Sequence, residues 1–138
     1  FDYIDIQDHL SRHCLADLYL DTFNYNGHTS TVDSLFSGLP VVTKIGNSFS
    51  GRVCASMLKA FDMQELITKT KEDYYKLITK LINNKSYYNE ILIKTKKNVT
   101  HSQLFNTRNY VHNLEKAFEK TLQMKIEKNT VENIFIEN

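Results

Sequence analysis

The order of apolar runs and helical patterns in the first half of the chain is the strongest constraint on its fold. A short apolar run at residues 18–20 is followed by a loop rich in Asn, Thr and Gly, and then by a helical pattern over residues 30–37. A second apolar run, at residues 39–43, is followed by a turn and by a helical pattern over residues 50–60. Apolar runs this short are typical of buried parallel strands. The repeated order of strand, loop and helix predicts an α/β fold, with a parallel sheet flanked by helices.

The spacing of apolar residues indicates which side of each helix faces the sheet. Val32, Leu35 and Phe36 recur at i, i+3 and i+4 and predict the inner face of the first helix. Gly38 follows at the position where a helix C-cap needs a left-handed residue. The inner face of the second helix is predicted at Val53, Met57 and Leu58.

The rest of the chain predicts further elements on both sides of these units. A short strand is predicted over residues 3–6 and a helix over residues 8–15, with Asp8 near its N-terminus, where a carboxylate is favoured. Beyond Thr70 only helical patterns occur, over residues 72–83, 86–98 and 107–126.

These elements predict one domain over residues 1–126, followed by a polar tail over residues 127–138. Within the domain, residues 1–68 are predicted to form βα units and residues 70–126 a helical part. Ile134, Phe135 and Ile136 are the apolar residues by which the tail could dock.

Composition narrows the classes of function. The 138 residues carry 17 Lys and Arg against 16 Asp and Glu, which gives no electrostatic case for a nucleic-acid partner. No apolar run approaches the ~20 residues of a membrane span, so no membrane partner is expected. Cys14 and Cys54 have no metal-ligand spacing and are expected to be reduced thiols of a cytoplasmic protein. The chain begins at Phe1 without a start Met, so we expect it to be part of a longer protein.

Residues 26–33, with the sequence NGHTSTVD, form the segment that carries chemistry. They lie between a predicted strand and a predicted helix, the place where open α/β sheets bind ligands. Gly27 allows close approach of the backbone, and the hydroxyls and N–H groups at the helix start suit a phosphate. His28 could donate to a phosphate or sugar oxygen, and Asp33 could accept from a ribose hydroxyl. The candidate residues of this segment are His28, Thr29, Ser30 and Asp33.

Two other interpretations stay open for these residues. A Ser/Thr cluster before a helix also serves as an ordinary N-cap, and Asp in a first turn is favoured without any ligand.

His9 and Arg12 share a helix face at i, i+3 spacing. They could meet a planar base by stacking and hydrogen bonding, or they could simply face solvent.

A long ordered stretch then resembles a known family. Residues 9–30 read HLSRHCLADLYLDTFNYNGHTS, and residues 33–43 continue as DSLFSGLPVVT. Gly46, the FSGRV of residues 49–53 and the LFNT of residues 104–107 follow in order. This pattern resembles the O-GlcNAc transferase and SPINDLY-type glycosyltransferases over about residues 9–122.

The resemblance implies the Rossmann-like C-terminal domain of a GT-B glycosyltransferase, in which two such domains face each other. It implies that His9 lies against the uracil with Arg12 nearby, that His28, Thr29 and Ser30 hold the pyrophosphate, and that Asp33 holds the ribose. The implied reaction is transfer of N-acetylglucosamine from UDP-GlcNAc to Ser or Thr of proteins. No metal or other cofactor is expected, because a helix dipole and side chains can neutralise the leaving diphosphate.

The resemblance also implies partners and leaves alternatives. The implied partners are the nucleotide sugar, the protein acceptor, and an N-terminal catalytic half and tetratricopeptide repeats of the same protein. The proposed general bases of the family lie before this chain begins, so no catalytic residue is assigned and the chain alone is expected to be inactive. Departures from the family pattern include Ser30 for Thr, Phe36 for Trp and Gly51 for Ala. Donors such as GDP-fucose or UDP-glucose, and a non-catalytic interaction module, therefore remain alternatives.

Overall fold

The computed structural model describes residues 4–127 and 133–136 of the chain, which divides into two compact units, residues 1–104 and residues 105–138. A parallel sheet lies at the centre of the first unit. Its three strands are β1 (Tyr19–Leu20), β2 (Val41–Lys44) and β3 (Ile67–Thr68), in that order across the sheet. Tyr19 pairs with Val41, and Thr43 pairs with Ile67. The predicted parallel sheet is thus confirmed, with β2 in the middle.

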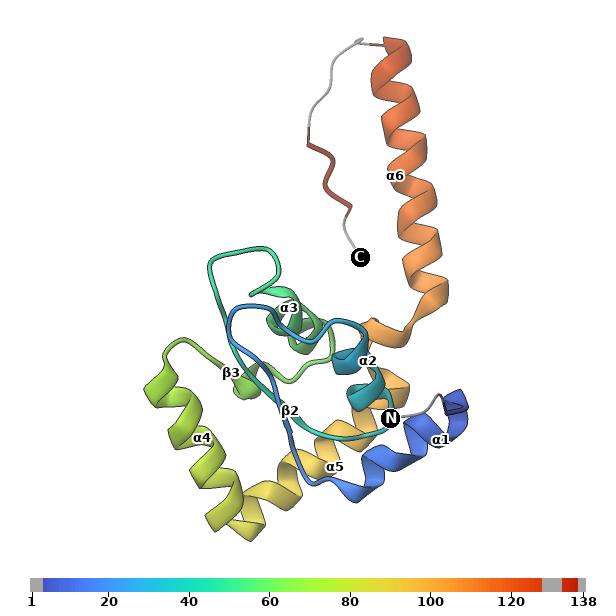
Figure 1. Ribbon diagram of the computed structural model, residues 1–138. Helices are drawn as coiled ribbons and strands as arrows, with labels where there is room; N and C mark the ends of the chain where they lie inside the picture. Colours follow the sequence, from blue (N-terminus) through green and yellow to red (C-terminus); the bar gives the residue numbers. More distant parts are fainter. Residues whose placement is uncertain (1–3, 128–132, 137–138) are drawn as a thin grey trace. The chain divides into compact units, whose positions relative to one another are not determined.

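The described residues of the first unit form five α-helices near this sheet (Figure 1): α1 (Ile6–Ser11), α2 (Thr29–Phe36), α3 (Val53–Ala60), α4 (Lys71–Asn83) and α5 (Lys85–His101). Helices α2, α3 and α4 all pack against β2, and α5 contacts α4 and α2. Two 3-10 turns, Arg12–Leu15 and Gln64–Leu66, follow α1 and precede β3. The sheet flanked by helices, and the change to helix alone after Thr70, agree with the sequence expectation.

The core of this unit lies where α2, α3 and α4 meet the central strand. Val41 and Val42 of β2 are completely buried, as are the side chains of Leu35, Leu58, Phe61, Met63 and Leu66. Apolar surface removed from water contributes roughly 25 cal/mol per Å² to folding, so this cluster is the main source of stability. Ser37 is the C-cap of α2, and Gly38, which follows it, has φ 76° and is the predicted left-handed residue at the helix end.

The strand predicted over residues 3–6 is wrong where the structure describes it, and Tyr3 lies outside the described residues. Asp5 is instead the N-cap of α1, and its Oδ1 accepts a hydrogen bond from the backbone N–H of Gln7 at 2.9 Å. Ile6 is the first residue of the helix, and Asp8 stands in its first turn. The cap and the acidic first turn stabilise a helix start, and they outweigh a strand preference that rests on a few residues.

The inner face predicted for α2 is partly wrong. Leu35 is fully buried, but Phe36 is 52% exposed, and Thr31 and Ser34 are buried in its place. Both hydroxyls donate to backbone carbonyls one turn earlier, Thr31 to Gly27 at 2.7 Å and Ser34 to Ser30 at 2.8 Å. These internal hydrogen bonds remove the cost of burying polar groups, so small polar residues can pack where a large ring would not fit.

The second unit consists mainly of the long helix α6 (Thr107–Glu127), which confirms the helix predicted over residues 107–126. A 3-10 turn, Gln103–Phe105, precedes it. Of the predicted polar tail, the structure describes Glu127 and residues 133–136, and the Phe135 carbonyl accepts a hydrogen bond from Lys120 Nζ at 3.0 Å. In the described part of the chain, no helix has both the length and the apolar character needed to cross a bilayer.

Candidate functional site

Four of the predicted site residues, His28, Thr29, Ser30 and Asp33, lie where the loop of residues 21–28, called here the β1–α2 loop, enters α2. This loop leaves the carboxyl end of β1 and enters α2, so it lies at the edge of the sheet where open α/β folds bind ligands. A second loop, residues 45–52, leaves the neighbouring strand β2 at the same edge. The two are joined by a hydrogen bond of 2.9 Å from the Asn26 N–H to the Ser50 carbonyl.

A buried carboxylate, that of Asp21, holds the β1–α2 loop in shape. Its Oδ1 accepts from the Gly27 N–H at 2.7 Å, and its Oδ2 accepts from the Thr43 hydroxyl at 2.5 Å. The Asp21 backbone carbonyl accepts from the Tyr74 hydroxyl at 3.0 Å. Asp21 therefore connects the loop to β2 through its carboxylate and to α4 through its backbone carbonyl. Hydrogen bonds to a carboxylate are charge-assisted and are stronger than neutral ones. The role of Asp21 was not predicted from the sequence, although its place directly after the first strand was visible there.

Asn26 is a second anchor of the loop, and its role was not predicted from the sequence. Its side chain is completely buried, its Nδ2 donates to the Thr22 carbonyl at 2.8 Å, and its Oδ1 accepts from the Cys54 N–H at 3.4 Å. The last contact reaches the start of α3. Asp21 and Asn26 together fix the path of the loop before it reaches α2.

Gly27 is required by close packing and not by its backbone angles. A Cβ atom at this position would lie 2.6 Å from Ser30 Oγ, 2.6 Å from Tyr19 Oη and 2.8 Å from Thr31 Oγ1. These distances are far below van der Waals contact. Because Gly27 has no side chain, three hydroxyl groups can gather at the start of α2.

His28 is the N-cap residue of α2, and aromatic rings hold its imidazole. The ring of Tyr25 stacks on it with centroids 4.9 Å apart and an interplanar angle of 15°, and Phe49 meets it edge-on at 6.4 Å. His28 Nε2 is buried and has no hydrogen-bond partner within the described residues. Unpaired buried polar atoms are rare in native proteins, and those that occur are often completed by a bound ligand, ion or water. The imidazole is thus a fixed group with one unused nitrogen.

Thr29 and Ser30 are exposed in the first turn of α2. The first N–H groups of any helix have no acceptor within the helix, and the helix dipole places partial positive charge there. Ser30 Oγ also lies 3.0 Å from Tyr19 Oη, which connects the helix start to β1. Hydroxyls, N–H groups and the imidazole of His28 therefore meet at one helix end, an arrangement that suits an anion such as a diphosphate.

The structure brings His9 and Asp33 together, which the sequence did not predict. His9 Nε2 lies 3.1 Å from Asp33 Oδ2, so the two residues join α1 to α2 across 24 positions of sequence. Arg12 is exposed in the 3-10 turn after α1. Within the described residues, Arg12 makes no hydrogen bond or ion pair with the other predicted site residues.

Burial and the charge of Asp21 keep two neighbouring groups in their protonated form. Burial, and secondarily Asp21, raises the pKa of the Cys54 thiol to about 12. The same two causes raise the pKa of the Tyr74 hydroxyl to about 12. A thiol needs ionisation to act as a nucleophile, so Cys54 is a packing residue and no candidate nucleophile.

The loop after β2 is closely packed at Gly51, where the family pattern has Ala. A Cβ atom on Gly51 would lie 3.1 Å from Ser48 Oγ and 3.4 Å from Gly46 Cα. The Gly46 N–H donates to the Gly51 carbonyl at 2.7 Å, so the two glycines bring the two sides of the loop together.

Within residues 4–127 and 133–136, no group of three or more His, Cys, Asp or Glu side chains is placed to hold a metal ion.

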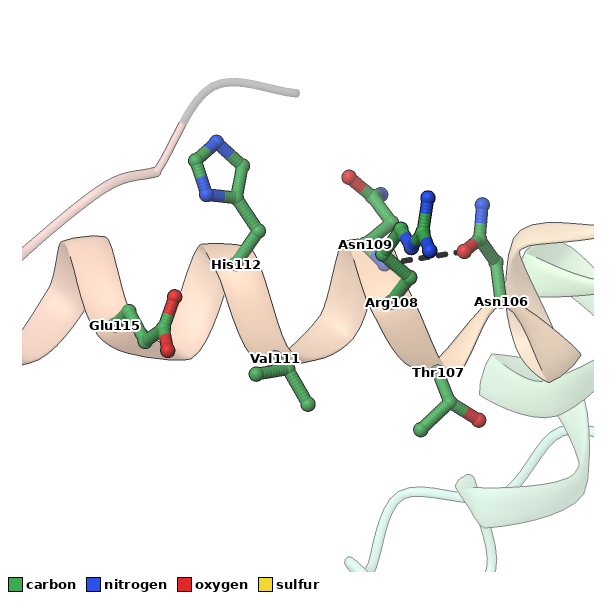
Figure 2. Close-up of a pocket in the computed structure, with 7 residues that line it drawn as sticks. All are labelled: Asn106, Thr107, Arg108, Asn109, Val111, His112 and Glu115. Atoms are coloured by element: carbon green, nitrogen blue, oxygen red, sulfur yellow. Dashed lines mark hydrogen bonds between the residues drawn. The ribbon is translucent and has the colours of Figure 1, made fainter.

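A surface pocket along the first turns of α6 contains none of the predicted site residues. It is lined by Asn106, Thr107, Arg108, Asn109, Val111, His112 and Glu115. Figure 2 shows that Thr107 and Val111 project from the opposite side of α6 to His112, so these groups do not converge on one point. The dashed line in Figure 2 is the helix cap, in which Asn106 Oδ1 accepts from the Asn109 N–H at 3.0 Å. We assign no site there.

Comparison with known sequences gives a consistent set of relatives. The model of the family described as glycosyl transferase family 41 matches residues 4–114. A UDP-N-acetylglucosamine–peptide N-acetylglucosaminyltransferase of Caenorhabditis elegans is 35% identical over 109 residues, which are 79% of this chain and 10% of the relative. A protein of Hordeum vulgare named as a probable UDP-N-acetylglucosamine–peptide N-acetylglucosaminyltransferase, SPINDLY, is 31% identical over 111 residues. These residues are 80% of this chain and 12% of the relative. The chain therefore spans about a tenth of the length of these curated relatives.

Comparison with solved structures agrees. A mutant of the O-GlcNAc transferase of Thermobaculum terrenum is similar with a TM-score of 0.79 at 25% sequence identity. The match covers 87% of this chain and 23% of that one. It confirms the predicted fold class, the Rossmann-like C-terminal part of a GT-B glycosyltransferase.

Proposed function

Because the chain belongs to glycosyltransferase family 41, we propose that it forms the donor-binding part of an enzyme that transfers a sugar to proteins. The proposed donor is UDP-GlcNAc and the proposed acceptors are Ser and Thr side chains. The name of the C. elegans relative gives that donor and a peptide acceptor for that protein. The observation that supports the donor role best is the start of α2, where His28, whose Nε2 has no hydrogen-bond partner within the described residues, directly precedes Thr29 and Ser30, two exposed residues with hydroxyls.

The start of α2 is the proposed place of the diphosphate. The hydroxyls of Thr29 and Ser30, the first N–H groups of the helix and His28 Nε2 can donate to its oxygens. Negative charge that develops on the leaving diphosphate would be stabilised by these fixed donors. This proposal requires no metal ion, and transfer activity that survives a chelator in the full-length protein is its test.

The nucleoside is proposed to lie toward α1. The ring of His9, with Arg12 one turn later, offers a surface for the base, and Asp33 can accept from the ribose hydroxyls. Neither a nucleophile nor a general base is assigned to this chain. We propose that the remaining catalytic groups, and tetratricopeptide repeats for acceptor choice, belong to the rest of the longer protein. The proposed compartment is the cytoplasm, which agrees with two free cysteines, Cys14 and Cys54.

Calorimetric titration with UDP, UDP-GlcNAc and GDP tests the donor proposal. We expect uridine nucleotides to bind the chain, and the double variant His28→Ala/Asp33→Ala to lose that binding. A preference for GDP would instead indicate fucose transfer. Failure of uridine nucleotides to bind both the chain and the full-length protein would contradict the proposal and favour a non-catalytic interaction module.

A further inference from the structure

The contact between His9 and Asp33 joins two residues that the proposed function assigns to different parts of the donor. His9 belongs to α1 and Asp33 to α2, and the atoms 3.1 Å apart are Nε2 and Oδ2. The two side chains are 26% and 21% exposed. Such partial burial reduces the competition of water for the hydrogen bond, so the contact has more weight than one on an open surface.

The chemistry of the contact fixes which nitrogen of His9 carries the proton. An ionised carboxylate can only accept hydrogen bonds, so Nε2 must donate. In the neutral ring, Nδ1 is then the unprotonated nitrogen. Carboxylates that accept from one imidazole nitrogen commonly set the tautomer and the orientation of the ring in this way.

A second histidine limits the movement of the His9 ring. The ring of His13 meets it edge-on, with centroids 5.2 Å apart and an interplanar angle of 79°. His13 itself is held by its Nδ1, which lies 3.0 Å from the His9 carbonyl and 3.2 Å from the Leu10 carbonyl. The plane of His9 is therefore set by Asp33 at one nitrogen and by His13 at the ring.

Asp33 keeps acceptor capacity beyond this contact. His9 contacts only its Oδ2, and a carboxylate offers about four lone-pair sites over two oxygens. One carboxylate can thus hold the His9 ring and still accept from a ribose hydroxyl. The base and the ribose of a nucleoside would then be recognised by connected groups.

We propose that Asp33 is a positioning residue for His9: it holds the ring in the Nε2–H form and in the plane on which the base of the donor stacks. The proposal rests on the proposed donor function, and it adds a dependence of base recognition on Asp33. It predicts that the contributions of His9 and Asp33 to nucleotide affinity are coupled.

A purely structural role for Asp33 would be to hold α1 against α2. The chain offers a matched control for that role, because the Ser37 hydroxyl also joins the two helices by donating to the Leu10 carbonyl at 3.2 Å. Ser37→Ala removes this contact and leaves the His9–Asp33 pair in place. A variant that merely loosens α1 should therefore behave like Ser37→Ala.

The first test reads the ring of His9 directly, by nitrogen-15 NMR of the ligand-free chain at about pH 8, where an unperturbed imidazole is neutral. The signals are assigned with His9→Gln. We expect the Nε2–H form in the wild type and in Ser37→Ala, a mixture of both tautomers in Asp33→Ala, and partial retention in Asp33→Asn, whose amide oxygen still accepts. An unchanged tautomer in a folded Asp33→Ala chain would overturn the proposal.

The second test is a double-mutant cycle on UDP affinity with His9→Ala, Asp33→Ala and the double variant. If the two residues are coupled, the double variant loses less UDP affinity than the product of the two single losses predicts. We expect its affinity to be higher than that prediction by about threefold or more. Ser37→Ala should bind as the wild type does. Losses that multiply would overturn the proposal. If neither the wild-type chain nor the full-length protein binds a uridine nucleotide, the donor function fails, and the tautomer measurement still decides the role of Asp33.

Discussion

Among the four glycines, Gly27 has the least space for an added Cβ atom, and the proposed diphosphate site depends on that close packing. We predict that Gly27→Ala destabilises the chain by about 1–3 kcal/mol, the usual cost of overpacking. The reason is that the new methyl group would lie 2.6 Å from both Ser30 Oγ and Tyr19 Oη. Urea denaturation measures the loss, and calorimetry should show weaker UDP binding because the start of α2 must shift.

The control for this variant is Asn24→Ala, in an exposed part of the same loop. An exposed substitution of this kind should change stability by less than about 0.5 kcal/mol. If Gly27→Ala is as stable as the wild type, the hydroxyls of Ser30, Tyr19 and Thr31 can move apart without a cost in stability, and the prediction is wrong.

Tyr25 is the residue that we expect to hold the imidazole of His28. Aromatic pairs contribute about 0.5–1.5 kcal/mol beyond simple burial, so Tyr25→Ala should weaken UDP binding by roughly threefold to tenfold. Tyr25→Phe keeps the stacked ring, whose centroid lies 4.9 Å from that of His28, and should bind within about twofold of the wild type. Calorimetric titration of the two variants side by side checks this, and equal losses in both would assign the effect to the hydroxyl.

The candidate site residues that could be predicted from the sequence are those whose role depends on their local position in the chain. His28, Thr29 and Ser30 follow a strand and begin a helix, so their place at the sheet edge could be inferred from the order of elements. The partners of Asp21 and the contact of His9 with Asp33 depend on how separate elements pack. No spacing rule connects residues 24 positions apart, so these contacts required the structure.

At the scale of elements, length and capping decided which predictions were correct. The helices α4, α5 and α6 have long apolar patterns, and each was predicted within a few residues of its ends. β3 contains only Ile67 and Thr68, too short for any alternation to be visible, and it was not predicted as a strand. Sheet pairing with β2, and not the propensity of two residues, makes this segment a strand.

Asn84 supports the change of direction between α4 and α5, and it provides a test at this scale. It is the C-cap of α4 and the N-cap of α5, where its Oδ1 accepts from the Tyr87 N–H at 3.0 Å. We predict that Asn84→Ala lowers the free energy of unfolding by about 1 kcal/mol, the typical value of a side-chain cap. Asn84→Ser keeps a capping oxygen and should lose less. The neighbouring Asn83→Ala, at an exposed helix position, is the control, and an equal loss there would contradict the capping role.

For the whole molecule, one buried carboxylate connects most of the first unit. Asp21 follows β1, bonds to β2 through Thr43, shapes the loop that enters α2, and accepts at its backbone carbonyl from Tyr74 of α4. Cys54 of α3 lies close enough for the charge of Asp21 to affect its pKa. The same residue thus orders the candidate site and stabilises the fold around it, so a substitution of Asp21 cannot separate function from stability.

The groups around Asp21 predict how stability responds to alkaline pH. The Cys54 thiol and the Tyr74 hydroxyl have ordinary pKa values of 9.0 and 10.0, and burial beside Asp21 raises each pKa to about 12 in the folded chain. Between these values the unfolded state releases protons that the folded state keeps. Their contribution to stability is therefore fully present below about pH 9 and is lost progressively as pH rises toward 12, by at most about 1.4 kcal/mol per pH unit for each group.

Urea denaturation of the wild type and of Cys54→Ala/Tyr74→Phe between about pH 7 and 11 measures this effect. Other lysines and tyrosines titrate in both proteins, so the difference between the two pH profiles isolates the buried pair. We expect the free energy of unfolding to fall more steeply above about pH 9 in the wild type than in the double variant, because only the wild type must keep two buried protons. Parallel profiles would mean that Cys54 and Tyr74 reach water in the folded chain, and that α3 and α4 do not close over Asp21 as tightly as their burial indicates.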